Sequence, residues 1–469
     1  MKNNHLQIGI VALSTFLLTG LFVLFAKGAM QFGASDVLMS QTPMETRKIA
    51  PVNYDTRISK GDSLMSSGYY SLAASEYAFA VNLQADSPEA YLKLGKAYMA
   101  LGEYGKALEV FKKAFEIDSR NLIYLSLYGE ALIKNGKFQE AQNVFDGFTK
   151  ETQEGKYYAA LLDSYFGRFE DAQKKLEKAK SLNGTIPANY INRIASAYSG
   201  FSQGQEGQTV YLKALLTQAF IDVKEYQLAA GLALDILGSK SDYRDVWIML
   251  GYAQLKTQAY TDAEESFKQA KKLDAIKPET HYFLGTALYF EEKYEEAVNE
   301  FELAVLYGFK PENEAYRKIA ESQLFLEKYE ESLEAYEHLV KIDGGGSVDI
   351  FVRPVWIALT YIKDMERALS LAELAVQTFP NEAMSHNLMA WVYMEKNELD
   401  KADAEIKNAF SIDPNFAEAH YNAGRLREKQ GNADGAIWEY KKAYELSKAG
   451  DSISALASER YNALISANE

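Results

Sequence analysis

The sequence of 469 residues contains no cysteine. Disulfide bonds are therefore excluded, and so is a lipid anchor on a lipobox cysteine, so the packing of side chains must stabilise the fold. Basic residues are also in the minority, with 50 Lys and Arg against 65 Asp and Glu and a formal net charge of -15. This balance argues against a nucleic-acid-binding surface, which needs a basic patch or stripe.

Groups with catalytic or metal-binding chemistry are equally scarce. Gly61-Asp62-Ser63-Leu64 spells the nucleophile block of the GDSL hydrolases, but none of the five histidines has an aspartate three residues before it, as that family requires. His281, His386 and His420 are spaced as equivalent packing positions, too far apart to share a metal ion. We therefore predict no enzyme activity, no catalytic residue, no cofactor and no metal site.

Long apolar runs are absent with one exception, at residues 6–26. About 20 apolar residues are enough to cross a bilayer, and the run is longer than the apolar region of a typical cleavable signal peptide. We expect a short tail at 1–5, a transmembrane signal anchor at 6–26 and a flexible tether at 27–53. The repeat domain is then extracytoplasmic on a single-pass membrane protein; the alternative is secretion after signal cleavage.

The rest of the chain is dominated by an internal repeat. Alanines recur at a spacing that is mostly 34 residues, a glycine stands twelve residues before several of them, and a large residue stands four after. The alanines are Ala73, Ala107, Ala141, Ala172, Ala229, Ala263, Ala297, Ala368, Ala402 and Ala436. Spacings of three, four and seven place these residues on helical stripes, two per repeat, so each repeat is predicted to be a helical hairpin.

The pattern resembles the tetratricopeptide repeat family. The match is close at Tyr91, Leu94, Gly95, Tyr98, Gly102, Tyr104, Ala107, Phe111 and Ala114, and again at Trp247, Leu250, Gly251, Tyr260, Ala263, Phe267 and Ala270. The resemblance implies an all-α, right-handed superhelical solenoid of stacked helix-turn-helix units. Near residue 349 the register is less regular, because Trp356 stands where glycine or alanine is usual.

The repeats divide into two predicted blocks. Residues 54–182 hold about four repeats, and residues 210–450 hold about seven. Ala172 and Ala229 are 57 residues apart, which leaves room for an inserted helix and a bend at 183–209. A final helix at 451–469 fits the capping element that a solenoid needs.

In the resembled family, positions 2, 5, 9, 12 and 13 of the first helix of each repeat face the ligand. Carried across, these positions predict a partner-binding wall made of Ile248, Tyr252, Leu255, Tyr282, Tyr289, Phe290, Leu324, Phe325, Tyr361, Trp391 and Tyr421. An exposed apolar wall of this kind usually marks a partner site, although the same residues could instead pack against adjacent helices.

Function is predicted from this combination. The leading hypothesis is a membrane-anchored scaffold that binds a peptide or protein partner on its concave surface and supports assembly of an envelope complex. The alternative is a glycan-binding or cell-wall-binding solenoid, since stacked Tyr and Trp rings suit sugar faces.

Overall fold

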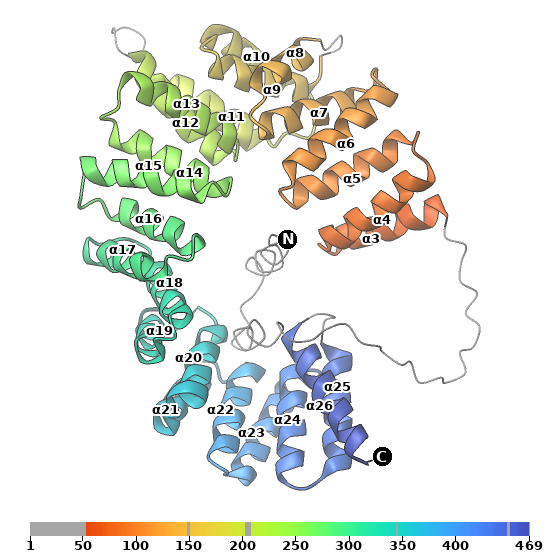
Figure 1. The fold of residues 1–469 in the computed structure, drawn as a ribbon, viewed down its shortest axis with the longest axis vertical. Helices are drawn as coiled ribbons and strands as arrows, with labels where there is room; N and C mark the ends of the chain where they lie inside the picture. Colours follow the sequence, from red (N-terminus) through yellow and green to blue (C-terminus); the bar gives the residue numbers. More distant parts are fainter. Residues whose placement is uncertain (1–52, 148–150, 202–207, 344–345, 448–450, 469) are drawn as a thin grey trace. The chain divides into compact units, whose positions relative to one another are not determined.

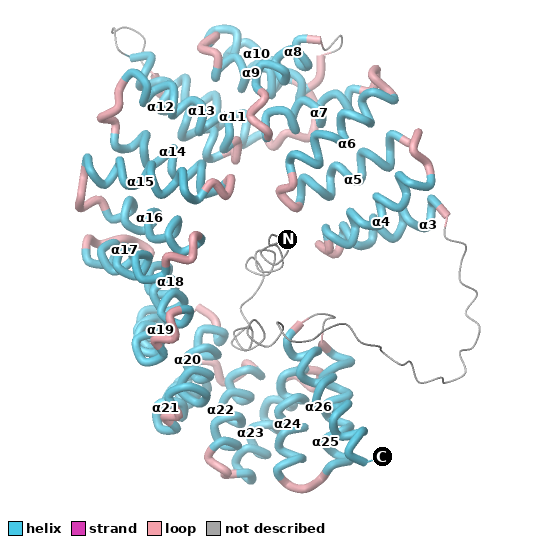
Figure 2. Tube along the Cα trace, viewed as in Figure 1, coloured by secondary structure: helices cyan, strands magenta, loops and turns pink. Residues whose placement is uncertain are grey.

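The computed structural model describes residues 53–147, 151–201, 208–343, 346–447 and 451–468. Within these ranges the chain consists of helices joined by short turns, with no strand (Figures 1 and 2). The all-α prediction is therefore confirmed. The predicted anchor and nearly all of the predicted tether lie outside the described residues, and among the described helices none combines the length and apolar character needed to span a membrane.

The described residues form two compact units, one ending at Glu291 and the other beginning at Glu292. The N-terminal unit contains α3 (Tyr54–Ser66), α4 (Tyr70–Leu83), α5 (Pro88–Ala100), α6 (Tyr104–Ile117), α7 (Leu122–Lys134), α8 (Phe138–Asp146), α9 (Gln153–Tyr165), α10 (Phe169–Ser181), α11 (Ala188–Ser199), α12 (Gln208–Asp222), α13 (Tyr226–Ser239), α14 (Arg244–Lys256), α15 (Tyr260–Leu273) and α16 (Pro278–Phe290).

The C-terminal unit contains α17 (Tyr294–Leu306), α18 (Glu312–Phe325), α19 (Tyr329–Asp343), η2 (Val348–Phe351), α20 (Val352–Ile357), η3 (Ala358–Ile362), α21 (Met365–Thr378), α22 (Ala383–Glu395), α23 (Leu399–Ile412), α24 (Ala417–Lys429), α25 (Ala433–Leu446) and α26 (Ser452–Asn468). In both units the recurring element is a pair of helices that contact each other along their length. The helix α26 follows the last pair and packs against α24 and α25.

A left-handed residue ends the first helix of each hairpin. At Gly102, with φ of +74°, the next amide, that of Glu103, donates to the Tyr98 carbonyl at 2.9 Å. This hydrogen bond spans six residues and closes the last helical turn in a Schellman motif. The same position in α14–α15 is occupied by Gln258, with φ of +63°, so the turn geometry is kept even where glycine is missing.

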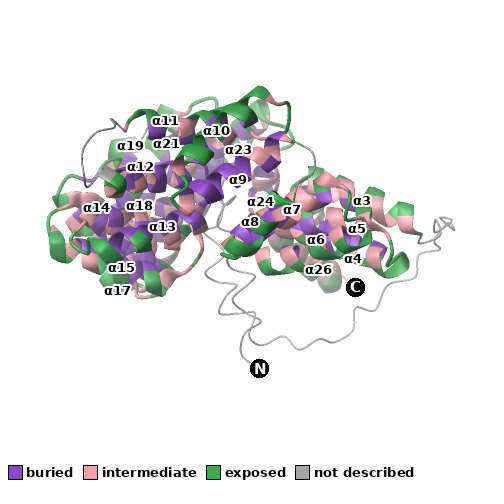
Figure 3. Cartoon of the chain, turned by 90° about the horizontal axis from the view of Figure 1, so that it is seen from above, coloured by how far each residue is buried: buried purple, intermediate pink, exposed green. Residues whose placement is uncertain are grey.

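Within a hairpin, an aromatic ring of the second helix lies directly on a glycine of the first. A methyl group on Gly95 would lie 2.3 Å from the Phe111 ring, and one on Gly251 would lie 2.7 Å from the Phe267 ring. The glycine and the large residue that mark the repeat in the sequence are therefore the two sides of one contact. The marker alanines, such as Ala107, are fully buried beside it, and buried positions run as stripes along the paired helices (Figure 3).

The helix α11 lies in the interval 183–209, where the extra helix is predicted. After it, α13 packs against both α7 and α9, which belong to earlier hairpins. Gly231 of α13 allows this approach, because a methyl group there would lie 2.8 Å from the Tyr165 ring. Lys134 of α7 donates to Glu225, the residue before α13, at 2.9 Å.

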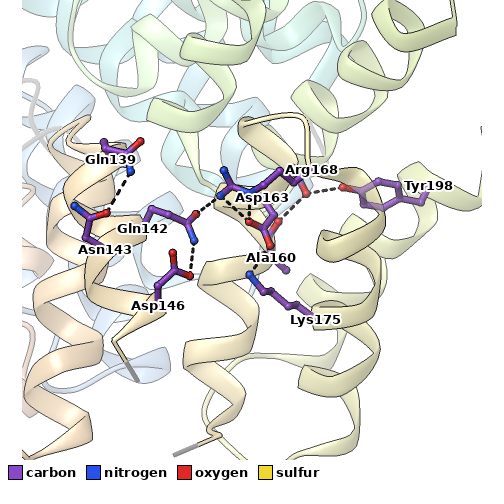
Figure 4. Close-up of polar contacts among 10 residues, drawn as sticks. Gln139, Gln142, Asn143, Asp146, Ala160, Asp163, Arg168, Lys175 and Tyr198 are labelled. Atoms are coloured by element: carbon purple, nitrogen blue, oxygen red, sulfur yellow. Dashed lines mark hydrogen bonds and ion pairs between the residues drawn. The ribbon is translucent and has the colours of Figure 1, made fainter. Parts of the chain in front are cut away.

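A buried polar network fastens α11 to the preceding hairpins (Figure 4). Asp163 of α9 is almost fully buried, accepts a hydrogen bond from Arg168 at 2.7 Å and forms an ion pair with Lys175 at 2.5 Å. Arg168 also donates to Gln142 of α8 at 2.8 Å. The neighbouring Ser164 shares a hydrogen bond of 2.6 Å with the hydroxyl of Tyr198 on α11. Each of these side chains has a hydrogen-bond or ion-pair partner inside the same unit. The network therefore holds the helices together and is not proposed as a binding site.

The contact of Gly95 with Phe111 leads to a stability prediction. The Gly95→Ala variant should unfold with a free energy lower by about 1–3 kcal/mol, because the added methyl group overpacks the hairpin. The matched control is Gly105→Ala in α6, where the nearest atom to an added methyl group is 3.9 Å away. Thermal unfolding followed by circular dichroism compares the two, and equal midpoints would contradict the proposed steric role of Gly95.

Candidate functional site

A pocket of about 280 Å³ lies on the C-terminal unit, where α20, α22 and α24 pack side by side. Its wall comes from one face of these helices and from the start of α26: Val352, Trp356, Thr360, Met384, Asn387, Leu388, Trp391, Glu418, Tyr421, Asn422, Arg425, Ser452 and Ile453. Residues more than 100 positions apart in the sequence thus surround one hollow, because successive repeats present the same helical face.

The repeat register explains which residues of α22 and α24 reach the pocket. Positions 2, 5 and 9 of both repeats line it, and these are Met384, Asn387 and Trp391 followed by Glu418, Tyr421 and Arg425. Trp391 and Tyr421 belong to the predicted wall, and the structure brings them together here. Their spacing of three and four residues along each helix places them on one stripe.

The α20 segment presents a different register. The helix passes into the π-helical turn η3 and ends at Lys363 in the left-handed region. A π-turn inserts one residue into the helical ladder and so rotates the positions that follow or precede it. Trp356 lines the pocket, although it is buried like its neighbour Ile357.

Buried amides form the polar part of the pocket wall. Asn422 donates to the side-chain oxygen of Asn387 at 2.9 Å and accepts from Arg425 at 3.3 Å. Arg425 also donates to Glu395 at 2.6 Å, so its charge is balanced inside the protein. The amide nitrogen of Asn387 reaches only the sulfur of Met384, at 4.0 Å, which is a weak acceptor.

Glu418 is the carboxylate of the pocket wall. Burial raises its pKa, and the nearby charges of Asp451, Asp349 and Asp413 raise it further, while its own backbone amide acts in the opposite direction. A carboxylate in the first turn of a helix is normally favoured by the helix dipole. At Glu418 this favourable contribution is outweighed by the loss of water.

A smaller pocket of about 40 Å³ beside α18 and α20 is organised differently. Burial would raise the pKa of Glu321 there, but Lys318 and Arg353 outweigh it and hold that pKa low; Lys318 donates to Glu321 at 2.9 Å. Burial raises the pKa of Tyr336 to about 12. The acidic group of this pocket is compensated by cations of the protein itself.

The predicted residues of the N-terminal unit line neither of these two pockets. Ile248, Tyr252 and Leu255 are half-buried, and the Tyr252 ring meets that of Phe283 edge-on at 5.3 Å. Tyr282, also half-buried, makes a similar contact with Phe283.

Two residues predicted as surface are interior packing. Tyr289 and Leu324 are 6% and 4% exposed, and both occupy position 12 of their repeat. That position lies in the last turn of the first helix, where the hairpin closes and the side chain enters the packing. These two residues therefore contribute no open surface.

Position 13 forms a regular aromatic stack between neighbouring hairpins. Its ring lies flat on the first aromatic of the preceding second helix: Phe290 on Tyr260 at 4.8 Å, Phe325 on Tyr294 at 4.7 Å, and Tyr361 on Tyr329 at 3.9 Å. Phe290 and Phe325 keep an exposed edge. At these three positions, inter-repeat packing accounts for much of the ring surface.

The prediction missed the polar residues of the pocket. Asn387, Glu418 and Arg425 occupy the same ligand-facing positions as the residues that were chosen, but they are not apolar. Reading positions 2, 5 and 9 without regard to polarity would have included them. Trp356 had no such signal, because it stands where glycine or alanine is usual.

Comparisons with known proteins agree with the repeat architecture. Tetratricopeptide repeat family models match residues 245–276 and 387–451, and a model described as anaphase-promoting complex, cyclosome, subunit 3 matches residues 70–148. No curated protein matches the sequence.

Several solved structures are similar at low identity. The APC/C hetero-tetramer Cut9-Hcn1 matches with 13% identity and a TM-score of 0.33, and the match covers 88% of this chain and 96% of that chain. Yeast Tom70 matches with 14% identity and a TM-score of 0.29, and the match covers 88% of this chain and 96% of that chain. A thermophilic tetratricopeptide repeat protein of Thermus thermophilus matches with 25% identity, 40% of this chain, 99% of that chain and a TM-score of 0.31.

The paired helices define an α-helical repeat protein, and tetratricopeptide repeat proteins are in general non-enzymatic scaffolds that bind proteins or peptides. Two family models place tetratricopeptide repeats at residues 245–276 and 387–451, and the other described hairpins are built in the same way.

The raised pKa of Glu418 predicts a pH-dependent stability. A carboxyl whose pKa is higher in the folded state binds more protons folded than unfolded, so the stability it contributes falls as pH rises through its titration range. Glu418→Gln should therefore raise the unfolding midpoint at neutral pH and have less effect in acid. Glu373→Gln, at an exposed position of α21, is the control; a Glu418 variant without any pH-dependent gain would contradict the burial cost.

Proposed function

We propose that this protein is a scaffold that binds a peptide segment of a partner protein in the pocket between α20, α22, α24 and α26. The observation that carries the proposal is the pocket itself: ligand-facing positions of successive repeats converge on one hollow of about 280 Å³. Pockets for small ligands have volumes of about 300–1,000 Å³, so this hollow suits one or two side chains of an extended segment.

The pocket wall has the groups that peptide binding requires. Trp356, Trp391 and Tyr421 offer apolar and aromatic area. The amide nitrogen of Asn387 makes a weak contact with the Met384 sulfur. It can therefore donate a hydrogen bond to a main-chain carbonyl of the peptide. An extended peptide presents such a carbonyl at every residue, which is why an amide donor beside an apolar hollow favours a peptide over a purely apolar ligand.

We propose further that residues 6–26 anchor this scaffold in a membrane, with the repeat domain on the extracytoplasmic side, where it would support assembly of an envelope complex. This part of the proposal is supported by the length and apolar character of the run in the sequence. The bound partner would then be held near the membrane surface.

Filling the pocket tests the binding proposal. Random peptides displayed on phage are selected on the immobilised full-length chain, and binding of the enriched peptides is measured on Ser452→Trp, which places an indole in the pocket wall. We expect at least about tenfold weaker binding, a loss of about 1.4 kcal/mol. Ser411→Trp, at an exposed position of α23, is the matched control; equal binding by both variants would contradict the pocket as the site.

Removal of residues 1–26 tests the anchor. The full-length chain should stay in the membrane fraction after alkaline extraction, and the truncated chain should be released. The mature N-terminus is sequenced in parallel. A soluble full-length chain, or a mature chain that begins after the apolar run, would contradict the anchor and support secretion after cleavage.

A further inference from the structure

Glu418 is a carboxylate without a cationic partner in a pocket wall of aromatic, aliphatic and amide side chains. Among the described residues, no Lys, Arg or His forms an ion pair with it, and its stabilising contact is with its own backbone amide. Two other first-turn glutamates do have such a partner: Glu89 lies 3.9 Å from Lys93, and Glu279 lies 3.0 Å from Lys277. Glu418 is half-buried, and a carboxylate that loses water without gaining a cationic partner destabilises the protein in its ionised form.

The charges around Glu418 are of the same sign. Asp349 of η2, Asp413 before α24 and Asp451 before α26 all act on it and raise the free energy of its ionised form. The cation of the pocket wall is Arg425, which is seven residues further along α24, or about 10 Å at 1.5 Å per residue, and Glu395 already balances it. One end of the pocket therefore carries a net negative potential, and the other end is neutral.

Aromatic side chains line the space beside this negative end. Trp356, Trp391 and Tyr421 are all part of the pocket wall. Aromatic faces attract cations through the ring quadrupole, most strongly when the cation is removed from water. Arg425 already lies over the Trp391 ring, at 5.9 Å from its centre, which shows that a guanidinium fits against this wall.

We propose that the pocket recognises a basic side chain, lysine or arginine, of the partner peptide. Its aliphatic stem lies along the aromatic wall, and its charged head pairs with Glu418. The proposal rests on the proposed peptide-binding function and specifies its ligand chemistry. Beside Glu321 the cations belong to the protein itself, whereas beside Glu418 the ligand would supply the cation. A basic segment also complements the net charge of -15 of the whole chain.

The test uses a peptide enriched in the display selection and a copy in which its basic residue is replaced by norleucine, which keeps the alkyl stem and removes the charge. Binding of both to the full-length chain in detergent micelles is measured by fluorescence anisotropy, for the unmodified protein and for Glu418→Gln. We expect the norleucine copy to bind the unmodified protein at least about tenfold more weakly, in line with the coupling energies of close charge pairs. Glu418→Gln should lower the affinity for the basic peptide but not for its norleucine copy. The two peptides should therefore bind this variant with nearly equal affinity.

Controls separate this proposal from the one on which it rests. Glu373→Gln should bind both peptides as the unmodified protein does, and thermal unfolding confirms that Glu418→Gln remains folded. Two results would overturn the cation proposal and leave peptide binding standing. In the first, the enriched peptides lose binding on Ser452→Trp but carry no basic residue. In the second, Glu418→Gln changes the affinity of the basic peptide and of its norleucine copy by the same factor. Enriched peptides that bind Ser452→Trp as tightly as the unmodified protein would overturn both the cation proposal and the pocket as the peptide site.

Discussion

The close contact between a glycine of one helix and an aromatic ring of the next is the constraint on which the architecture depends. At Gly95 and Gly251 the two helices of a hairpin approach until a single ring, that of Phe111 or Phe267, fills the space between them. This approach aligns the first helices of successive hairpins closely enough for their outer faces to form one wall. Around the pocket this contact occurs in α24–α25, where the Tyr440 ring lies on Gly424, whereas α20 and α22 have Trp356 and Ala390 at the equivalent position.

The sequence predicted the fold well, for a physical reason. Every hairpin solves the same packing problem with the same residue types, so the signal is repeated many times and survives the loss of any one residue. Gln258 takes the left-handed turn position without glycine and leaves the hairpin intact. What could not be predicted is packing between elements that are distant in the sequence: the contact of α13 with α7 and α9 depends on the path of the chain after α11, and no periodic pattern records it.

The site was predicted only in part. Trp391 and Tyr421 line one pocket because the register of α22 and α24 is regular, and their part in binding stays a prediction. Tyr289 and Leu324 were assigned to the surface, but position 12 turns into the packing near the end of the helix. Glu418 and Asn387 were passed over because the search favoured apolar residues, although a partner site needs unsatisfied polar groups as much as apolar area. A ligand-facing position is thus set by geometry, and its residue type indicates what kind of ligand it meets.

The packing of α13 against α7 changes how the N-terminal unit responds to force and to partial opening. In a simple array each repeat contacts only its neighbours, so repeats can detach from an end one at a time. Here the ion pair of Lys134 with Glu225 ties the third hairpin to the fifth, and the contact of Gly231 with Tyr165 ties the fourth to the fifth. The intervening helices cannot open while that tie holds, so residues 122–239 are joined into one cooperative block, and a pull on either end of the chain would reach it as a single mechanical element.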